Sequence, residues 1–127
     1  MEKDVKYWVD LSKYDIKTSD AMFKSRRYLY VLFTCQQAVE KILKALVTKY
    51  TRQFPPKTHD LLKLIELSKI DIDEIQKEFL SKLSFYYIET RYPQEIAKIL
   101  KDINGKMALE YLKNTKALIK WLKLKLK

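Results

Sequence analysis

The side chains best suited to act on a phosphate group lie in three separate parts of this 127-residue chain. The six candidates are Gln37, Lys41, Lys44, His59, Arg91 and Tyr92. Metal-independent RNA cleavage needs a group that transfers protons near neutral pH and a fixed cation beside the phosphate, which histidine and arginine supply. Arg91 with His59, the only histidine, or with Tyr92 would form such a catalytic set. All six are also candidates for binding a nucleotide or nucleic acid without reaction.

Each candidate also has a purely structural interpretation. His59 would satisfy local backbone groups or pack between helices. Arg91 would bond a carboxylate such as Glu40 or Glu89 and fix the end of a helix, or it would bind phosphate while Tyr92 stacks on a base or sugar. The lysine stripe, formed by Gln37, Lys41 and Lys44, is either a solvated face or the lining of a groove, with Glu40 neutralising part of its charge.

Composition excludes several other chemistries. A single glycine leaves no glycine-rich phosphate loop, and neither an HExxH pattern nor a cysteine–histidine metal pattern occurs. The lone Cys35 forms no internal disulfide and lies in an apolar stretch, so we interpret it as a core residue. We expect no metal and no cofactor.

The net charge of +10 is spread unevenly along the chain. Residues 1–25 balance at five basic and five acidic, residues 26–53 carry six basic against one acidic, and residues 111–127 carry six lysines and no acid. Such an excess favours a polyanionic partner, RNA or DNA above all, because each neutralised phosphate releases counterions. The alternative is a lysine-rich solvated surface of the kind enriched in thermophiles.

Long helices must position these residues, because one glycine and three prolines leave too few turns for a β-rich domain. Helical periodicity predicts a first helix from Val5 to about Lys24, capped by Asp4, and a second from about Arg27 to Tyr50. A short third helix follows a cap at Thr58, and a fourth runs from an Asp71–Glu74 capping box to about Glu89. A fifth covers Ala108–Leu122. For residues 94–103, after the stop at Pro93, a short helical turn and irregular chain are both compatible with the pattern. No composition break occurs, so we expect 1–127 to form one all-α domain, an antiparallel up-and-down bundle of four to five helices.

The chain shows no sign of membrane insertion or export. No stretch approaches the roughly 20 apolar residues of a membrane span, and the first residues have no signal-peptide pattern. Residues 121–127 alternate basic and apolar types, and we expect Trp121 and Leu122 to anchor the last helix rather than touch a membrane. We expect a cytoplasmic protein.

Three segments resemble the HEPN domain family. They are Gln36-Gln37-Ala38-Val39-Glu40-Lys41-Ile42-Leu43-Lys44-Ala45-Leu46, then Thr58-His59-Asp60-Leu61, then Arg91-Tyr92-Pro93. The resemblance implies a helical bundle that is usually a homodimer and binds nucleotides. It also implies pairing with a small nucleotidyltransferase, and several members act as metal-independent ribonucleases in toxin–antitoxin or other defence systems.

The ribonuclease pattern of that family is incomplete here. The resemblance requires a histidine four to six residues after the arginine, but Glu95, Ile96 and Ala97 occupy those positions after Arg91. We therefore expect a binding module that takes nucleotide, RNA or DNA or serves a nucleotidyltransferase partner, rather than an enzyme. The alternatives are a divergent ribonuclease and a non-catalytic scaffold for a larger complex.

Overall fold

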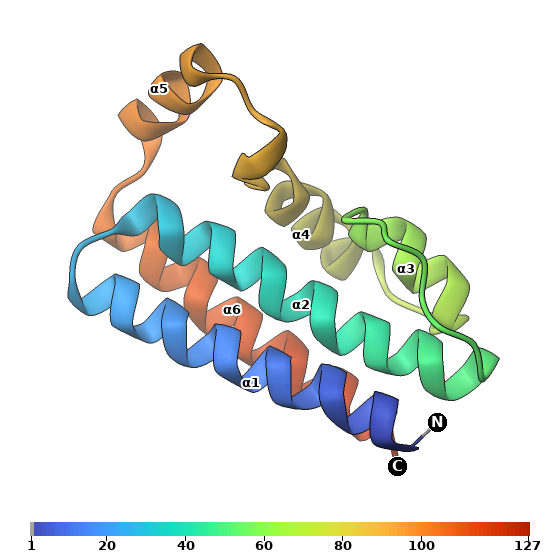
Figure 1. Ribbon diagram of the computed structural model, residues 1–127. Coiled ribbons are helices and arrows are strands. Elements are labelled where there is room, and N and C mark those ends of the chain that lie inside the picture. Colours follow the sequence, from blue (N-terminus) through green and yellow to red (C-terminus); the bar gives the residue numbers. More distant parts are fainter. Residues whose placement is uncertain (1) are drawn as a thin grey trace.

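The computed structural model describes residues 2–127, which form helices joined by short connectors (Figure 1). The helices are α1 (Glu2–Lys24), α2 (Tyr28–Thr51), α3 (Leu61–Ser68), α4 (Glu74–Phe85), α5 (Pro93–Asp102) and α6 (Gly105–Leu124), with a 3-10 turn η1 (Ile88–Thr90). The all-α class is confirmed. Residues 2–127 contain six α-helices rather than four to five, because the segment after Pro93 forms α5.

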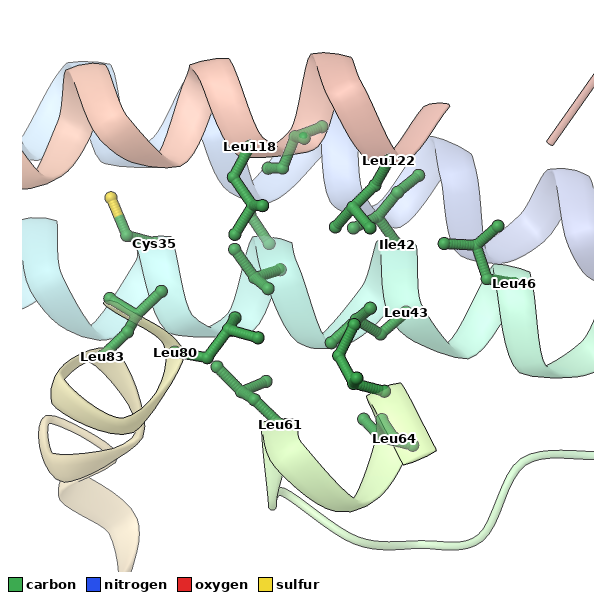
Figure 2. Close-up of a cluster of buried hydrophobic side chains, with 14 of the residues drawn as sticks. Cys35, Ile42, Leu43, Leu46, Leu61, Leu64, Leu80, Leu83, Leu118 and Leu122 are labelled. Carbon is green, nitrogen blue, oxygen red and sulfur yellow. The ribbon is translucent and has the colours of Figure 1, made fainter. Parts of the chain in front are cut away.

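Helix α2 is the centre of the molecule. It packs against α1 and α6 on one side and against α3 and α4 on the other (Figure 1). Leucines from α3, α4 and α6 converge on its apolar residues, among them Ile42, Leu43 and Leu46, which are completely buried (Figure 2). Cys35 lies in the same core, as predicted, and its burial raises the pKa of the thiol.

Two small residues of α1, Ser12 and Ser19, let this helix approach α2 closely. Both serines are fully buried, and each donates its hydroxyl hydrogen to a carbonyl of α2: Ser12 to Ala38 at 2.8 Å and Ser19 to Val31 at 3.0 Å. A buried hydroxyl must be satisfied, so these bonds fix the register of the two helices.

The direction of α6 departs from a simple up-and-down bundle. Helix α1 runs antiparallel to α2, but α6 runs parallel to it, because α6 begins beside the start of α2 and ends beside its end (Figure 1). At the first end, a Cβ on Gly105 would lie 3.0 Å from the Tyr28 hydroxyl oxygen, so a larger residue there would have to displace the tyrosine ring. At the other end, Lys49 and Tyr50 of α2 donate to the carbonyls of Leu126 and Lys125.

All three predicted helix caps are displaced, beginning with those of α3 and α1. Helix α3 is capped by Asp60, whose carboxylate accepts from the backbone N–H groups of Leu62 and Lys63 at 3.1 and 3.3 Å. Thr58, the predicted cap, instead accepts from the Asp60 backbone in the preceding turn. Helix α1 begins at Glu2, so Asp4 lies within its first turn rather than at the cap.

Helix α4 starts later and ends earlier than predicted. Its capping box pairs Asp73 with Gln76 instead of Asp71 with Glu74. The helix ends at Phe85 rather than at Glu89, because the chain turns away there into η1. No helix of residues 2–127 has the length and apolar character that crossing a membrane requires.

Candidate functional site

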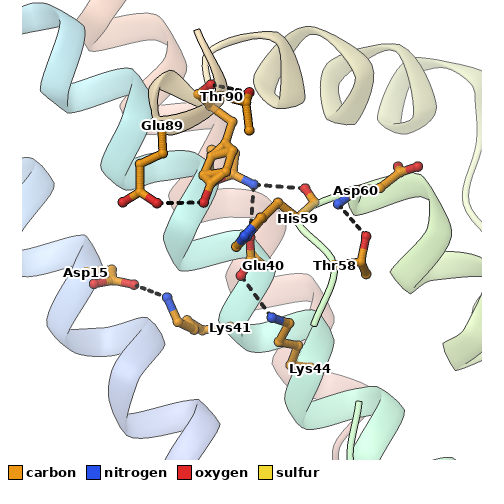
Figure 3. Close-up of polar contacts among 11 residues, drawn as sticks. Asp15, Glu40, Lys41, Lys44, Thr58, His59, Asp60, Glu89 and Thr90 are labelled. Carbon is orange, nitrogen blue, oxygen red and sulfur yellow. Dashed lines mark hydrogen bonds and ion pairs between the residues drawn. The ribbon is translucent and has the colours of Figure 1, made fainter. Parts of the chain in front are cut away.

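A buried carboxylate on α2 lies at the centre of the polar cluster shown in Figure 3. The side chain of Glu40 is only 4% exposed. Its Oε1 accepts from Gln36 Nε2 at 3.2 Å and lies 2.9 Å from His59 Nδ1, while Oε2 accepts from Lys44 Nζ at 3.0 Å. Burying a charge is costly unless it is paired. Lys44 supplies the opposite charge, and all three donors hold the carboxylate in place.

The lysine stripe of α2 faces α1 rather than solvent. Lys44 is buried, and its ammonium lies 5.4 Å from the ring centroid of Trp8 in addition to its bond with Glu40. Lys41 pairs with Asp15 of α1 at 3.3 Å, and burial raises the pKa of that carboxyl although Lys41 opposes the shift. The solvated-face interpretation is therefore wrong, and the expected neutralisation by Glu40 is confirmed for Lys44.

His59 is the partner of Glu40 that remains accessible. Its side chain is 48% exposed, and its ring lies against Tyr87 with centroids 4.2 Å apart. A carboxylate only accepts hydrogen bonds, so Nδ1 carries the hydrogen that points at Glu40. Among residues 2–127, Nε2 has no hydrogen-bond partner. It accepts when the ring is neutral and donates when the ring is protonated.

Tyr87 supports the histidine from the side of η1. Its ring is buried, stacks on Phe33 at a centroid distance of 5.7 Å, and directs its hydroxyl to the Glu89 carboxylate at 2.9 Å. Burial, and then the bond with Glu89, raise the pKa of this phenol, so it stays protonated. Sequence reasoning did not single out Tyr87, although it lies within the range predicted for the fourth helix.

Arg91 fixes the end of α4, as one interpretation predicted, but through a different acceptor. Its Nη2 donates to the Phe85 carbonyl at 2.8 Å, and its guanidinium carbon lies 4.5 Å from the Phe85 ring centroid. The carboxylate nearest to it is Glu95 at 4.0 Å, so the expected pairing with Glu40 or Glu89 is wrong.

The structure thus distributes the six candidates over three places. Gln37, Lys41 and Lys44 lie along α2, with both lysines held in ion pairs. His59 lies where α2, the start of α3 and η1 meet. Arg91 and the exposed Tyr92 lie between α4 and α5, and Arg91 shares no contact residue with His59. Within residues 2–127, no three His, Cys, Asp or Glu side chains are grouped to hold a metal ion.

Comparison with known proteins identifies the fold and the family of this helical bundle. The crystal structure of TT1696 from Thermus thermophilus has a similar fold, with a TM-score of 0.79 and 22% sequence identity over 95% of this chain and 97% of that chain. At this identity the likeness shows the fold alone. A search of curated proteins finds no match. The HEPN domain model matches residues 5–125, and the chain therefore belongs to the HEPN domain family.

Proposed function

We propose that this protein is a non-catalytic HEPN module that binds the phosphate of a nucleotide or nucleic acid at the exposed edge of His59. The observation that carries the proposal is the Glu40–His59 pair. The buried carboxylate holds Nδ1 and the Tyr87 ring supports the imidazole, so Nε2 is presented in a fixed direction. When the ring is protonated, Nε2 is a preorganised donor, which binds an anion at a lower entropic cost than a freely rotating side chain does.

Membership of the HEPN family and the net charge of +10 support a nucleic-acid or nucleotide ligand. The same membership supports a module that acts as a homodimer beside a small nucleotidyltransferase in a toxin–antitoxin or defence system. Co-expression of the chain with the product of a neighbouring nucleotidyltransferase gene, followed by size-exclusion chromatography, tests that pairing. Separate elution of the two proteins contradicts it.

Equilibrium binding tests the ligand. We expect a labelled single-stranded RNA or ATP to bind the wild-type protein, more weakly as salt rises, and His59→Ala to weaken binding about tenfold, equivalent to one charge-assisted hydrogen bond. Asn114→Ala, on the exposed surface of α6, is the control and leaves binding unchanged. Absence of binding, or equal binding by His59→Ala, overturns the proposal.

A divergent ribonuclease is the second candidate, and the same pair of residues favours it. A carboxylate that orients an imidazole is an arrangement used for general acid–base catalysis. Arg91 makes its contacts elsewhere, so the cation would have to come from another residue or a second subunit. Incubation of RNA with the protein in the presence of a chelator decides the question: cleavage lost in His59→Ala supports it, and cleavage retained there excludes it. A protein that neither binds nor cleaves fits the scaffold alternative.

A further inference from the structure

The face of the molecule away from α3 and α4 carries a groove between α1 and α6. The two helices lie side by side in opposite directions, and Lys116 of α6 bonds Asp20 of α1 across them at 2.7 Å (Figure 1). The groove has a volume of about 350 Å³ and is lined at its base by Ser12, Ile16 and Ile119. Five lysines line its walls: Lys13, Lys17, Lys116, Lys120 and Lys123.

Most of this positive charge has no ion-pair partner among residues 2–127, although Lys13 also acts on the nearby Asp10. Of the five lysines that line the groove, Lys116 alone forms an ion pair with another residue of the described chain. Burial lowers the pKa of Lys123, and the charge of Lys13 lowers it further, so two ammonium groups of opposite walls repel each other. A negatively charged occupant would relieve this repulsion.

The groove continues along α1 toward the amino terminus. A second hollow of about 510 Å³ shares Lys13 with the first and is lined by Val5 and Val9, beside Lys49 and Arg52. Val5, Val9 and Ile16 follow one face of α1, and the 11 residue steps from the first to the last cover roughly 16 Å at the helical rise, or about three turns. Two acidic residues, Glu2 and Asp10, also line this part.

We propose that this groove binds an acidic amphipathic helix of a partner protein, about three turns long. The apolar base accepts the aliphatic stripe of such a helix, as in other helix-in-groove complexes. Lys13 and Lys17 on α1, like Lys116 and Lys120 on α6, recur at the spacing at which carboxylates recur along a helix face. The occupant's two acidic flanks can therefore pair with the two walls.

A nucleic-acid strand suits the groove less well. Grooves that bind single strands supply aromatic rings on which bases stack, and no aromatic residue lines either part of this one. Glu2 and Asp10 would also repel a phosphate backbone, whereas a helix can place a lysine or an uncharged residue beside them. The groove contains none of the residues of the His59 site, so the two proposals are independent.

Fluorescence anisotropy at low salt tests the docking. The probes are a labelled acidic amphipathic peptide of about 15 residues with a leucine stripe, a scrambled peptide of the same composition, and a single-stranded RNA. The test variant is Lys17→Glu/Lys120→Glu. The control is Lys63→Glu/Lys77→Glu, which changes the net charge equally but lies on the exposed surfaces of α3 and α4.

We expect the amphipathic peptide to bind, the test variant to weaken its binding about tenfold or more, and the control to change it less than about twofold. His59→Ala should bind this peptide as well as the wild type does. If the scrambled peptide binds as well as the amphipathic one, charge alone attracts the peptide. If RNA binds more tightly than the peptide and the Lys17→Glu/Lys120→Glu variant loses this binding, nucleic acid is the occupant. Either result, or no peptide binding, overturns the proposal.

Discussion

Glu40 is the residue on which both structure and proposed function depend. Its nearly buried carboxylate contacts three donors, two of which are ionisable side chains. Replacement by glutamine leaves the Lys44 ammonium buried without its counter-ion. We expect Glu40→Gln to lower the free energy of unfolding by about 3 kcal/mol, as measured by urea denaturation.

A second Glu–Lys pair at the same spacing provides the control. Glu78 and Lys82 of α4 lie 3.2 Å apart, but both side chains are more than half exposed. Glu78→Gln should therefore change the free energy of unfolding by less than about 1 kcal/mol. Similar losses from the two substitutions would mean that burial does not strengthen the Glu40 pair.

The surroundings of the lysine stripe could not be predicted from periodicity. Helical spacing correctly places Lys41 and Lys44 on one face of α2, but whether that face meets water depends on the docking of α1. The residues that cover it, Asp15 and Trp8, are far away in sequence. The partner of Arg91 is equally difficult to predict, because a guanidinium bonds a main-chain carbonyl as readily as a carboxylate. The turn after α4 brings the Phe85 carbonyl, and not the carboxylate of Glu40 or Glu89, within its reach.

At the scale of the helix, the start of α4 offers a direct comparison between sequence and structure. The pattern predicts a cap at Asp71, whereas in the structure the Asp73 carboxylate accepts from the Gln76 backbone N–H at 2.7 Å. We expect Asp73→Ala to cost about 1 kcal/mol of stability in urea or thermal unfolding, because it leaves a first-turn N–H without its partner. Asp71→Ala should cost only a few tenths, and the reverse order would show that the cap lies where the sequence pattern places it.

Helix α5 explains why the sequence pattern is ambiguous for one segment. The pattern indicates Pro93 as the stop of a helix, but this proline occupies the first turn of α5, where its missing N–H costs nothing. Glu95 returns its carboxylate to the Tyr92 backbone N–H at 2.8 Å, which stabilises that start. The apolar residues Ile96, Ile99 and Leu100 recur at helical spacing, so periodicity does mark this helix in the sequence. Only Ile99 of the helix is buried, and the helix stands apart from the bundle (Figure 1), so the pattern alone does not show where it packs.

For the molecule as a whole, the sequence predicts the helical class and the family, and it identifies His59 as a candidate for the site. It does not reveal the α1–α6 groove, because the first 25 residues balance in charge, five basic against five acidic. Folding separates these charges: Asp15 turns to Lys41 of α2, while Lys13 and Lys17 line the groove. The parallel course of α6 is equally hidden, since it depends on the path of the chain between α4 and α6.

One core joins the helices around α2, so we expect residues 1–127 to unfold as a single cooperative domain. Tryptophan fluorescence reports on α1 and α6 through Trp8 and Trp121, and far-UV circular dichroism reports on all helices. The two urea transitions should coincide. Leu43→Ala, at a completely buried position of α2, should lower stability by about 3 kcal/mol by both probes, whereas Leu109→Ala, at a position 36% exposed, should cost less than about 1 kcal/mol. Separate transitions, or a loss seen by one probe only, would divide the chain into independent units, because a core shared by α1 to α4 and α6 transmits a cavity at its centre to each of these helices.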